Sequence, residues 1–245
     1  AVAPKFEDHY VALLNKDVDR SASALAASTT DVDPDETVID VRHVRRRFGD
    51  FYAVKDVTFD VKSGEVFGLL GANGAGKTTT FRMLCGLLPV SDGALTVAGR
   101  NLRKAAAEAR GRIGYMSQQF SLYGNLSVLQ NLRFFSRAYD LSGRRRRNRI
   151  QWALEQFDLN VFRDDTAGRL PLGYKQRLAL ACALMHEPEI LFLDEPTSGV
   201  DPLARRQFWH HINALANSGV TVLVTTHFME EAEYCDRLAV MTDGE

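Results

Sequence analysis

The hydrophobic residues of this chain fall into short runs that become regular after about residue 38. Three of these runs, EVFGLL (65–70), EILFLDE (189–195) and VTVLVTT (220–226), are apolar almost throughout. Such runs are typical of strands buried on both faces of a parallel sheet. Further strand-like runs occur at residues 38–44, 53–61, 94–99, 112–117 and 237–242. Helical patterns lie between them, so the chain is predicted to form a layered α/β core.

Helix-start signals and composition divide the chain further. Ser127 and the pair Asp201-Pro202 each precede a helical pattern, and both are favoured N-terminal arrangements. Residues 121–184 read as helical without strands and are expected to form a separate small lobe. Residues 19–37 are small, polar and acidic, which is the composition of a flexible linker.

The segment before that linker, residues 1–18, contains the amphipathic piece FEDHYVALL. We interpret it as the tail of a preceding domain, with residues 38–245 forming the main domain, truncated at its C-terminus. A native disordered N-terminal extension is the alternative interpretation.

Bulk composition narrows the classes of function. The 245 residues are 45% apolar and 25% charged, with a formal net charge of −1, which gives no general reason to expect nucleic acid as a partner. No run approaches the roughly 20 apolar residues needed to span a bilayer. Three widely spaced cysteines, Cys85, Cys182 and Cys235, are best explained as reduced and buried, consistent with the cytosol, although a reactive role is an alternative.

A glycine-rich loop follows one of the buried runs. GANGAGKT (residues 71–78) matches G-x-x-x-x-G-K-[ST], follows EVFGLL and precedes a helical run, the context that this phosphate-binding motif requires. Gly74 and Gly76 allow the backbone N–H groups to turn toward phosphate oxygens, and the helix start adds its positive end. Lys77 would contact the β- and γ-phosphates, and the Thr78 hydroxyl would bind Mg²⁺.

Two adjacent acids end another buried run. Asp194 and Glu195 close EILFLDE. Asp194 comes first off the strand and is predicted to hold the Mg²⁺ shell. Glu195 is predicted to act as the general base on the attacking water. Solvated acids at a strand end are the alternative, which the accompanying glycine loop disfavours.

With these motifs in order, the chain from residue 38 onward resembles the nucleotide-binding domain of ATP-binding cassette (ABC) proteins. The resemblance implies a P-loop NTPase core with a parallel sheet, an antiparallel β subdomain and a small helical subdomain. It implies that Gln118 reaches Mg²⁺ and the attacking water, with Gln119 the less favoured neighbour, and that His227 senses the γ-phosphate. Phe48 matches the position that stacks on adenine, with Tyr52 as the less favoured substitute.

The same resemblance sets the expected nucleotide contacts. They comprise the aromatic position, the glycine loop with the residue after it, the family's signature segment (residues 170–174 here) and the loop that links the two sites of a dimer. The residues are Phe48, Gly71, Ala72, Asn73, Gly74, Ala75, Gly76, Lys77, Thr78, Thr79, Leu172, Gly173 and Asp201. ATP and Mg²⁺ are the expected cofactors.

One segment departs from the family pattern. Residues 170–174 read LPLGY, where the family commonly has LSGGQ facing the P-loop of a partner domain. Pro171 lacks both a hydroxyl and an N–H group, and Leu172 adds bulk where the backbone should approach closely. We therefore expect the two sites of a dimer to be unequal. Tolerance of the change without functional cost is the alternative.

The resemblance also implies function and partners. It favours the ATPase subunit of an ABC-2-type exporter, cytoplasmic and peripheral on the inner face of the cell membrane, paired with a second nucleotide-binding domain and with separate permease subunits. That second domain would precede this one in the same chain or belong to a homodimer. A soluble tandem ABC ATPase acting on ribosomes or DNA is the alternative, and a catalytically silent regulatory module is disfavoured by the intact site residues. The arginine run at residues 144–147, together with Arg149, is interpreted as a solvated helix face, ahead of a lipid-headgroup or nucleic-acid contact.

Overall fold

The computed structural model describes residues 35–118 and 122–245. The predicted domain tail, most of the predicted linker and Gln119 lie outside the described residues. Within these ranges, no helix is long and apolar enough to cross a membrane.

The core is a five-stranded parallel sheet. Its strand order is β6 (Ile113–Met116), β7 (Ile190–Asp194), β8 (Thr221–Thr226), β3 (Val66–Leu70) and β9 (Arg237–Val240). Every residue of β3, β7 and β8 is buried. The strand assignment from near-continuous apolar runs is therefore confirmed, because strands in the middle of a covered sheet meet apolar neighbours on both faces.

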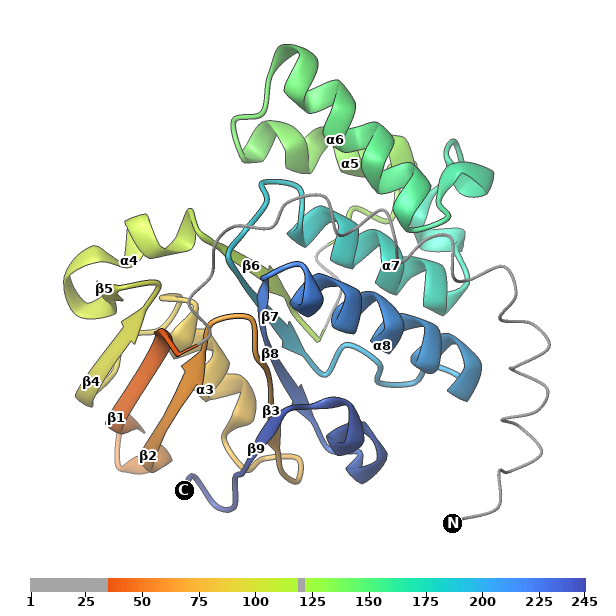
Figure 1. Cartoon of the computed structure of the whole chain (residues 1–245). Helices are drawn as coiled ribbons and strands as arrows, with labels where there is room; N and C mark the ends of the chain where they lie inside the picture. Colours follow the sequence, from red (N-terminus) through yellow and green to blue (C-terminus); the bar gives the residue numbers. More distant parts are fainter. Residues whose placement is uncertain (1–34, 119–121) are drawn as a thin grey trace.

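The two faces of this sheet belong to different hydrophobic clusters. On one face, side chains such as Phe67, Phe192 and Leu223 pack with helix α3 (Lys77–Leu84) and with the second sheet. On the other face, Leu191, Leu193, Val222 and Val224 pack with the helices α7 (Leu172–Ala183) and α8 (Pro202–Asn217). Alternate residues of each strand thus serve alternate layers, and the stacked arrangement is visible in Figure 1.

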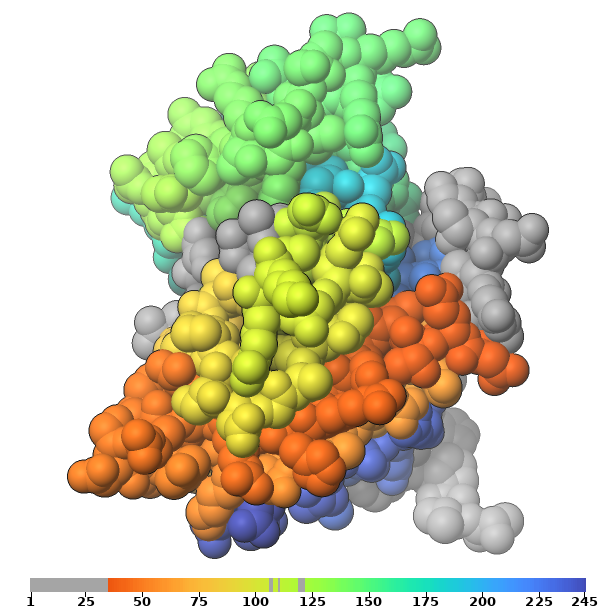
Figure 2. Space-filling view, turned by 90° about the vertical axis from the view of Figure 1, so that its left-hand side faces the viewer, coloured from red at the N-terminus to blue at the C-terminus, as the bar shows by residue number. Residues whose placement is uncertain are grey.

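The second sheet is antiparallel, in the order β2 (Phe51–Lys62), β1 (Thr37–Phe48), β4 (Asp92–Val97) and β5 (Arg100–Asn101). Helix α4 (Leu102–Arg110) follows it. Figure 2 shows β1 and β2 in orange and the β4–α4 region in yellow, forming one side of the molecule below the green helical lobe. The end of β1 lies beside the segment that follows α3, and a hydrogen bond joins the two: Arg46 Nη1 donates to Pro89 O at 2.9 Å.

The helical lobe contains α5 (Val128–Ala138), α6 (Gly143–Gln156) and the 3₁₀ turns η2 (Asn160–Phe162) and η3 (Ala167–Arg169), and packs on α7. Both predicted caps are present. Ser127 forms a capping box with Gln130, and the Asp201 side chain accepts from Ala204 N at 3.0 Å. These caps satisfy N–H groups that have no partner inside the helix.

The arginine run lies on α6. Arg145 contacts the Glu187 carboxylate at 2.6 Å on the surface. Arg149 is largely buried, stacks on Trp152 and donates to Leu184 O at 2.7 Å. Burial lowers the pKa of Arg149. The run therefore combines surface arginines with Arg149, which connects α6 to the end of α7 by a hydrogen bond.

Candidate nucleotide-binding site

The glycine loop joins β3 to α3 at the carboxyl end of the sheet. Gly74 and Gly76 have φ of 86° and 103°, a region where side chains with a Cβ are disfavoured. Gly76 is the N-cap residue of α3 and, as a glycine, has no side chain that could cap the helix. The first N–H groups of α3 therefore open toward the loop, as expected for an anion site at a helix N-terminus. Ala72, Asn73, Ala75 and Thr79 complete the predicted stretch, and Asn73 is exposed.

The segment after β9 braces this loop from behind. Met241 N donates to Leu70 O at 2.7 Å, and Gly244 N donates to Ala75 O at 3.1 Å. Gly244 O in turn accepts from Lys55 N of β2 at 2.7 Å. The loop is thereby held between the last strand of one sheet and a long strand of the other.

Lys77 turns back over the loop. Its side chain is buried, with 4% exposure, and Nζ donates to Gly71 O at 2.7 Å and to Ala72 O at 3.0 Å. Nζ also lies 3.3 Å from Glu195 Oε1. A buried ammonium is stable only with such partners, and its place within the loop suits it to oxygen atoms of a phosphate chain.

Asp194 ends β7 and is held by two hydroxyl groups. Thr225 Oγ1 donates to Asp194 Oδ1 at 2.7 Å, and Thr78 Oγ1 donates to the same oxygen at 3.3 Å. Burial raises the pKa of Asp194 above its ordinary value; these two hydrogen bonds and the Lys77 charge oppose that rise, while the Glu195 charge adds to it. Sequence reasoning missed Thr225, although it is one of two adjacent threonines that close β8, a strand that also begins with Thr221.

Glu195 follows β7 and lies close to residues at the start of α3, after β6 and at the end of β8. Its backbone φ is 46°, and its N–H donates to Thr225 Oγ1 at 2.9 Å. Its Oε2 accepts from Gln118 Nε2 at 3.1 Å and lies 3.3 Å from His227 Nδ1. The structure therefore brings Lys77, Gln118, Glu195 and His227 together around one carboxylate, from parts of the chain that are far apart in sequence.

The donor chemistry fits Mg²⁺. The Asp194 carboxylate, the Thr78 hydroxyl and the Gln118 amide oxygen are all oxygen ligands, which this cation prefers. The described residues contain no group of three or more His, Cys, Asp or Glu side chains able to hold a metal alone. Mg²⁺ is usually bound by one or two carboxylates together with substrate phosphates and water.

The predicted aromatic position lies at the tip of the β1–β2 hairpin. Phe48 and Tyr52 are 46% and 43% exposed. In the hairpin register Phe48 pairs with Phe51, and Arg47 pairs with Tyr52, so Phe48 and Tyr52 belong to adjacent pairs and extend to opposite faces of the hairpin. An arginine lies over each ring: Arg46 is 4.5 Å from the Phe48 centroid and Arg47 is 6.0 Å from the Tyr52 centroid.

The signature segment does not join this cluster. Leu172 begins α7, is 39% exposed, and its N-cap residue Pro171 makes no side-chain capping bond. An added Cβ on Gly173 would lie 3.2 Å from Ala204 at the start of α8. Asp201 caps α8. Among the described residues, no hydrogen bond or ion pair joins Leu172, Gly173 or Asp201 to the glycine loop; Leu172 and Asp201 are exposed, and Gly173 is partly buried.

The cysteines lie outside the site chemistry. Burial raises the pKa of Cys85 and Cys182 well above the usual range and that of Cys235 to about 12. Thiols with such pKa values stay protonated and unreactive near neutral pH. Two histidines are likewise structural: His186 stacks on Tyr139, and burial lowers the pKa of His211 to about 4.

Comparison with known proteins identifies the family to which this chain belongs. Residues 54–198 match the ABC transporter family. The chain is 55% identical over 243 residues to the probable multidrug ABC transporter ATP-binding protein YbhF of Escherichia coli (strain K12), covering 98% of this chain and 42% of that protein. It is 44% identical over 207 residues to the Nod factor export ATP-binding protein I of Burkholderia orbicola, covering 84% of this chain and 68% of the relative. The chain belongs to the ABC transporter family.

Solved structures agree with this assignment. The cbiO1 protein of Clostridium perfringens, part of the ABC transporter complex cbiONQ, superposes with a TM-score of 0.78 at 30% identity, covering 86% of each chain. A dimeric ATP-binding cassette in a post-hydrolysis state, bound to ADP and Pi, gives a TM-score of 0.76 at 28% identity, covering 84% of this chain and 95% of that one. The expected ABC ATPase fold is confirmed. The chain spans less than half the length of YbhF, so it corresponds to part of that relative.

Proposed function

We propose that this chain is the ATP-binding and ATP-hydrolysing domain that powers a membrane exporter of the ABC-2 type. The observation that carries the proposal is the convergence of Lys77, Asp194, Glu195, Gln118 and His227 at one end of the parallel sheet. The names of the relatives support the export role, since they include a probable multidrug transporter component, a Nod factor export protein and a linearmycin resistance protein.

Each residue has a role that follows from its place. Lys77 would exchange its neutral loop carbonyls for phosphate oxygens, because an ammonium gains more from charged than from neutral acceptors. The several negative charges of the phosphate chain would also compete with the single charge of Glu195 for this ammonium. Thr78 and Asp194, with Gln118, would hold Mg²⁺, which supplies charge neutralisation at the phosphates when bound. Release of Lys77 leaves the Glu195 carboxylate to accept a proton from the attacking water. Gln118 and His227, already beside that carboxylate, would orient the water and respond to the γ-phosphate.

The partners follow from the surface that the chain leaves open. The exposed start of α7 would complete the nucleotide site of a second cassette domain, which we place before this one in the same polypeptide, in keeping with a relative of more than twice this length. Separate permease subunits would anchor the pair at the inner face of the cell membrane. Nucleic acid is not an expected partner.

The altered signature gives this proposal its sharper form. Leu172 and Pro171 replace a small residue and a hydroxyl donor at a helix N-terminus, where donors to phosphate normally stand. The site completed by this surface would therefore turn over more slowly than the site built on Lys77 of this chain, provided the partner brings an unaltered signature.

ATP hydrolysis measured in the full-length protein tests both the export role and the inequality of the two sites. The catalytic glutamate of each cassette domain is changed to glutamine separately, and steady-state ATPase is recorded together with the fraction of protein that co-sediments with membranes or with ribosomes. We expect Glu195→Gln to remove most of the turnover and the corresponding change in the partner to remove little. Equal losses would reject unequal sites, and ribosome association without membrane association would reject the export role.

A further inference from the structure

Arg46 links the proposed adenine-stacking ring to the segment that follows the P-loop helix. Its guanidinium lies 4.5 Å from the centre of the Phe48 ring, and Nη1 donates to Pro89 O at 2.9 Å. Its Nε is buried without a hydrogen-bond partner. Burying an unpaired charged donor costs free energy, and the face of an aromatic ring supplies a compensating attraction. The arginine is therefore held by the ring and the carbonyl together.

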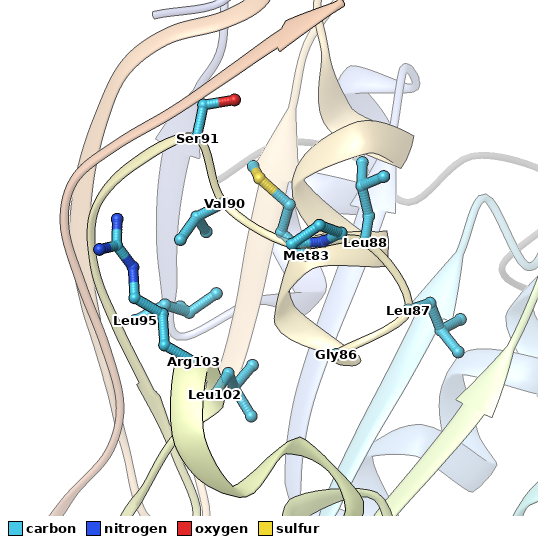
Figure 3. Close-up of a pocket in the computed structure, with 10 residues that line it drawn as sticks. Met83, Gly86, Leu87, Leu88, Val90, Ser91, Leu95, Leu102 and Arg103 are labelled. Carbon is cyan, nitrogen blue, oxygen red and sulfur yellow. The ribbon is translucent and has the colours of Figure 1, made fainter.

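Two more hydrogen bonds fix the same end of β1. Arg47 N donates to Ser91 Oγ at 3.0 Å, and Ser91 N donates to Arg45 O at 2.8 Å. The segment that forms these hydrogen bonds with β1, residues 86–91, also lines a pocket of about 430 Å³. Figure 3 shows the side chains of Leu88, Val90 and Leu95 around this hollow, with Ser91 at its edge. Helix α3 leads directly into this segment, so the P-loop and Phe48 are joined through a continuous, hydrogen-bonded path.

We propose that Arg46 is a positioning residue for the adenine base, acting through Phe48. The inference rests on the proposed ATP site. A cation over one face of the ring fixes its orientation and leaves the other face for the base. It also anchors the ring to the segment after α3, so the distance between the base platform and the phosphate loop is set before nucleotide arrives. Preorganisation of this kind lowers the ordering cost of binding.

The hairpin offers a matched control. Arg47 stands over Tyr52 at 6.0 Å, beyond close contact, and the Arg47–Tyr52 pair extends to the opposite face of the hairpin from Phe48. Removing the Arg47 side chain therefore removes the same charge from the same strand without touching the Phe48 platform. If Tyr52 were the stacking ring, the two arginines would exchange roles in the experiment.

The test is a double-mutant cycle in nucleotide affinity. ATP and inorganic tripolyphosphate are titrated by calorimetry into the wild-type chain and into Arg46→Met, Arg46→Lys, Phe48→Leu, Arg47→Met and the double variant Arg46→Met/Phe48→Leu. We expect Arg46→Met to weaken ATP about fivefold, the size of one partly exposed cation–π contact. Tripolyphosphate affinity should change less than twofold. Arg46→Lys should recover part of the loss, and Arg46→Met should cost nothing further once Phe48 is absent.

The outcomes separate this inference from the proposed function. Equal weakening of ATP and tripolyphosphate would show a general structural effect and overturn the positioning role. A full Arg46→Met loss in the Phe48→Leu background, or a larger effect of Arg47→Met, would also overturn it. Wild-type ATP binding with an unaffected Arg46→Met variant would reject the inference alone, whereas absence of any ATP binding by the wild type would reject the proposed function with it.

Discussion

The glycine loop (residues 71–78) with the neighbouring Asp194, and the signature segment (residues 170–174), lie in one domain but present opposite kinds of surface. Asp194 is 1% exposed and receives hydrogen bonds from two threonines. Leu172 is 39% exposed and begins a helix whose N-cap has no side-chain hydrogen bond. The first region is assembled by the chain itself, and the second is a surface available to a partner. Under the proposed function, ATP binding would depend on the first surface, and full turnover would depend on the second surface as well.

The largest expected effect is on ATP affinity, which should depend on the glycine loop and not on the signature segment. Lys77→Met should weaken ATP binding about 50-fold, because a buried charge-assisted contact with phosphate is lost. Leu172→Ala, which truncates an exposed side chain, should leave ATP affinity of the single chain within twofold. Calorimetric titration of both variants checks the comparison. A similar loss in the two variants would show that the signature segment already contributes to the site of its own domain.

A second change weakens the self-assembled region from within. Thr225→Val removes the hydroxyl that donates to Asp194 and accepts from Glu195 N. We expect the free energy of unfolding to fall by about 2 kcal/mol, the penalty for leaving buried polar groups unpaired. Urea denaturation measures it, and Thr225→Ser, which keeps the hydroxyl, should lose much less. Equal stability of the valine variant would remove Thr225 from the supporting structure of the site.

A third change repairs the signature surface. The double variant Pro171→Ser/Leu172→Gly restores a hydroxyl, an N–H group and space at the start of α7. In the assembled full-length protein, turnover at the site that this surface completes should rise about tenfold, since donors aimed at developing charge lower the barrier. ATPase should be measured with the Glu195→Gln change present, so that only that site turns over. No increase would support tolerance of the altered signature.

The smallest expected effect is a displacement along the pH axis. Burial raises the pKa of Asp194 above the ordinary 3.8, and the Thr225 hydrogen bond opposes the rise. As pH falls through this raised pKa, Asp194 takes up a proton and loses its charge, so Mg²⁺-dependent ATP binding should decline at a higher pH than for an ordinary aspartate. Thr225→Val should move the decline to still higher pH. Titrations from neutral pH downward measure the midpoint in both proteins, and an unmoved midpoint would contradict the assigned hydrogen bond.

The sequence predicted the strands and the chemistry of the site through different signals. Buried strands were found because both faces meet apolar neighbours, and the two predicted caps were found because their side chains act locally. The two-residue strand β5 was missed, since its pairing partner in β4 and not its own composition defines it. Helix α4, capped by Asn101, was also missed. Strand β5 depends on its pairing within the antiparallel sheet, whereas α4 has local signals in its helix-forming residues and in the Asn101 N-cap.

The site shows the same division. Lys77 and Asp194 were predicted because motifs record their spacing along the chain. The Lys77–Glu195 contact, the Thr225 support and the Arg46–Phe48 pair were not predicted. Each joins residues on different elements or depends on how a strand end packs, so their geometry is set by the relative placement of strands and not by local sequence. Thr225 had a readable signal, a pair of threonines after the apolar middle of β8, whereas Arg46 had none beyond its neighbour Phe48.

The brace behind the P-loop has a consequence for how the domain comes into being. Gly244 bonds both to Ala75 of the glycine loop and to Lys55 of β2. During synthesis the loop emerges from the ribosome long before its brace, and most of the domain must be translated in between. The hydrogen bonds between Gly244 and the loop can form only after residue 244 has been translated, so the loop lacks this support while β6, β7 and β8 are still being made.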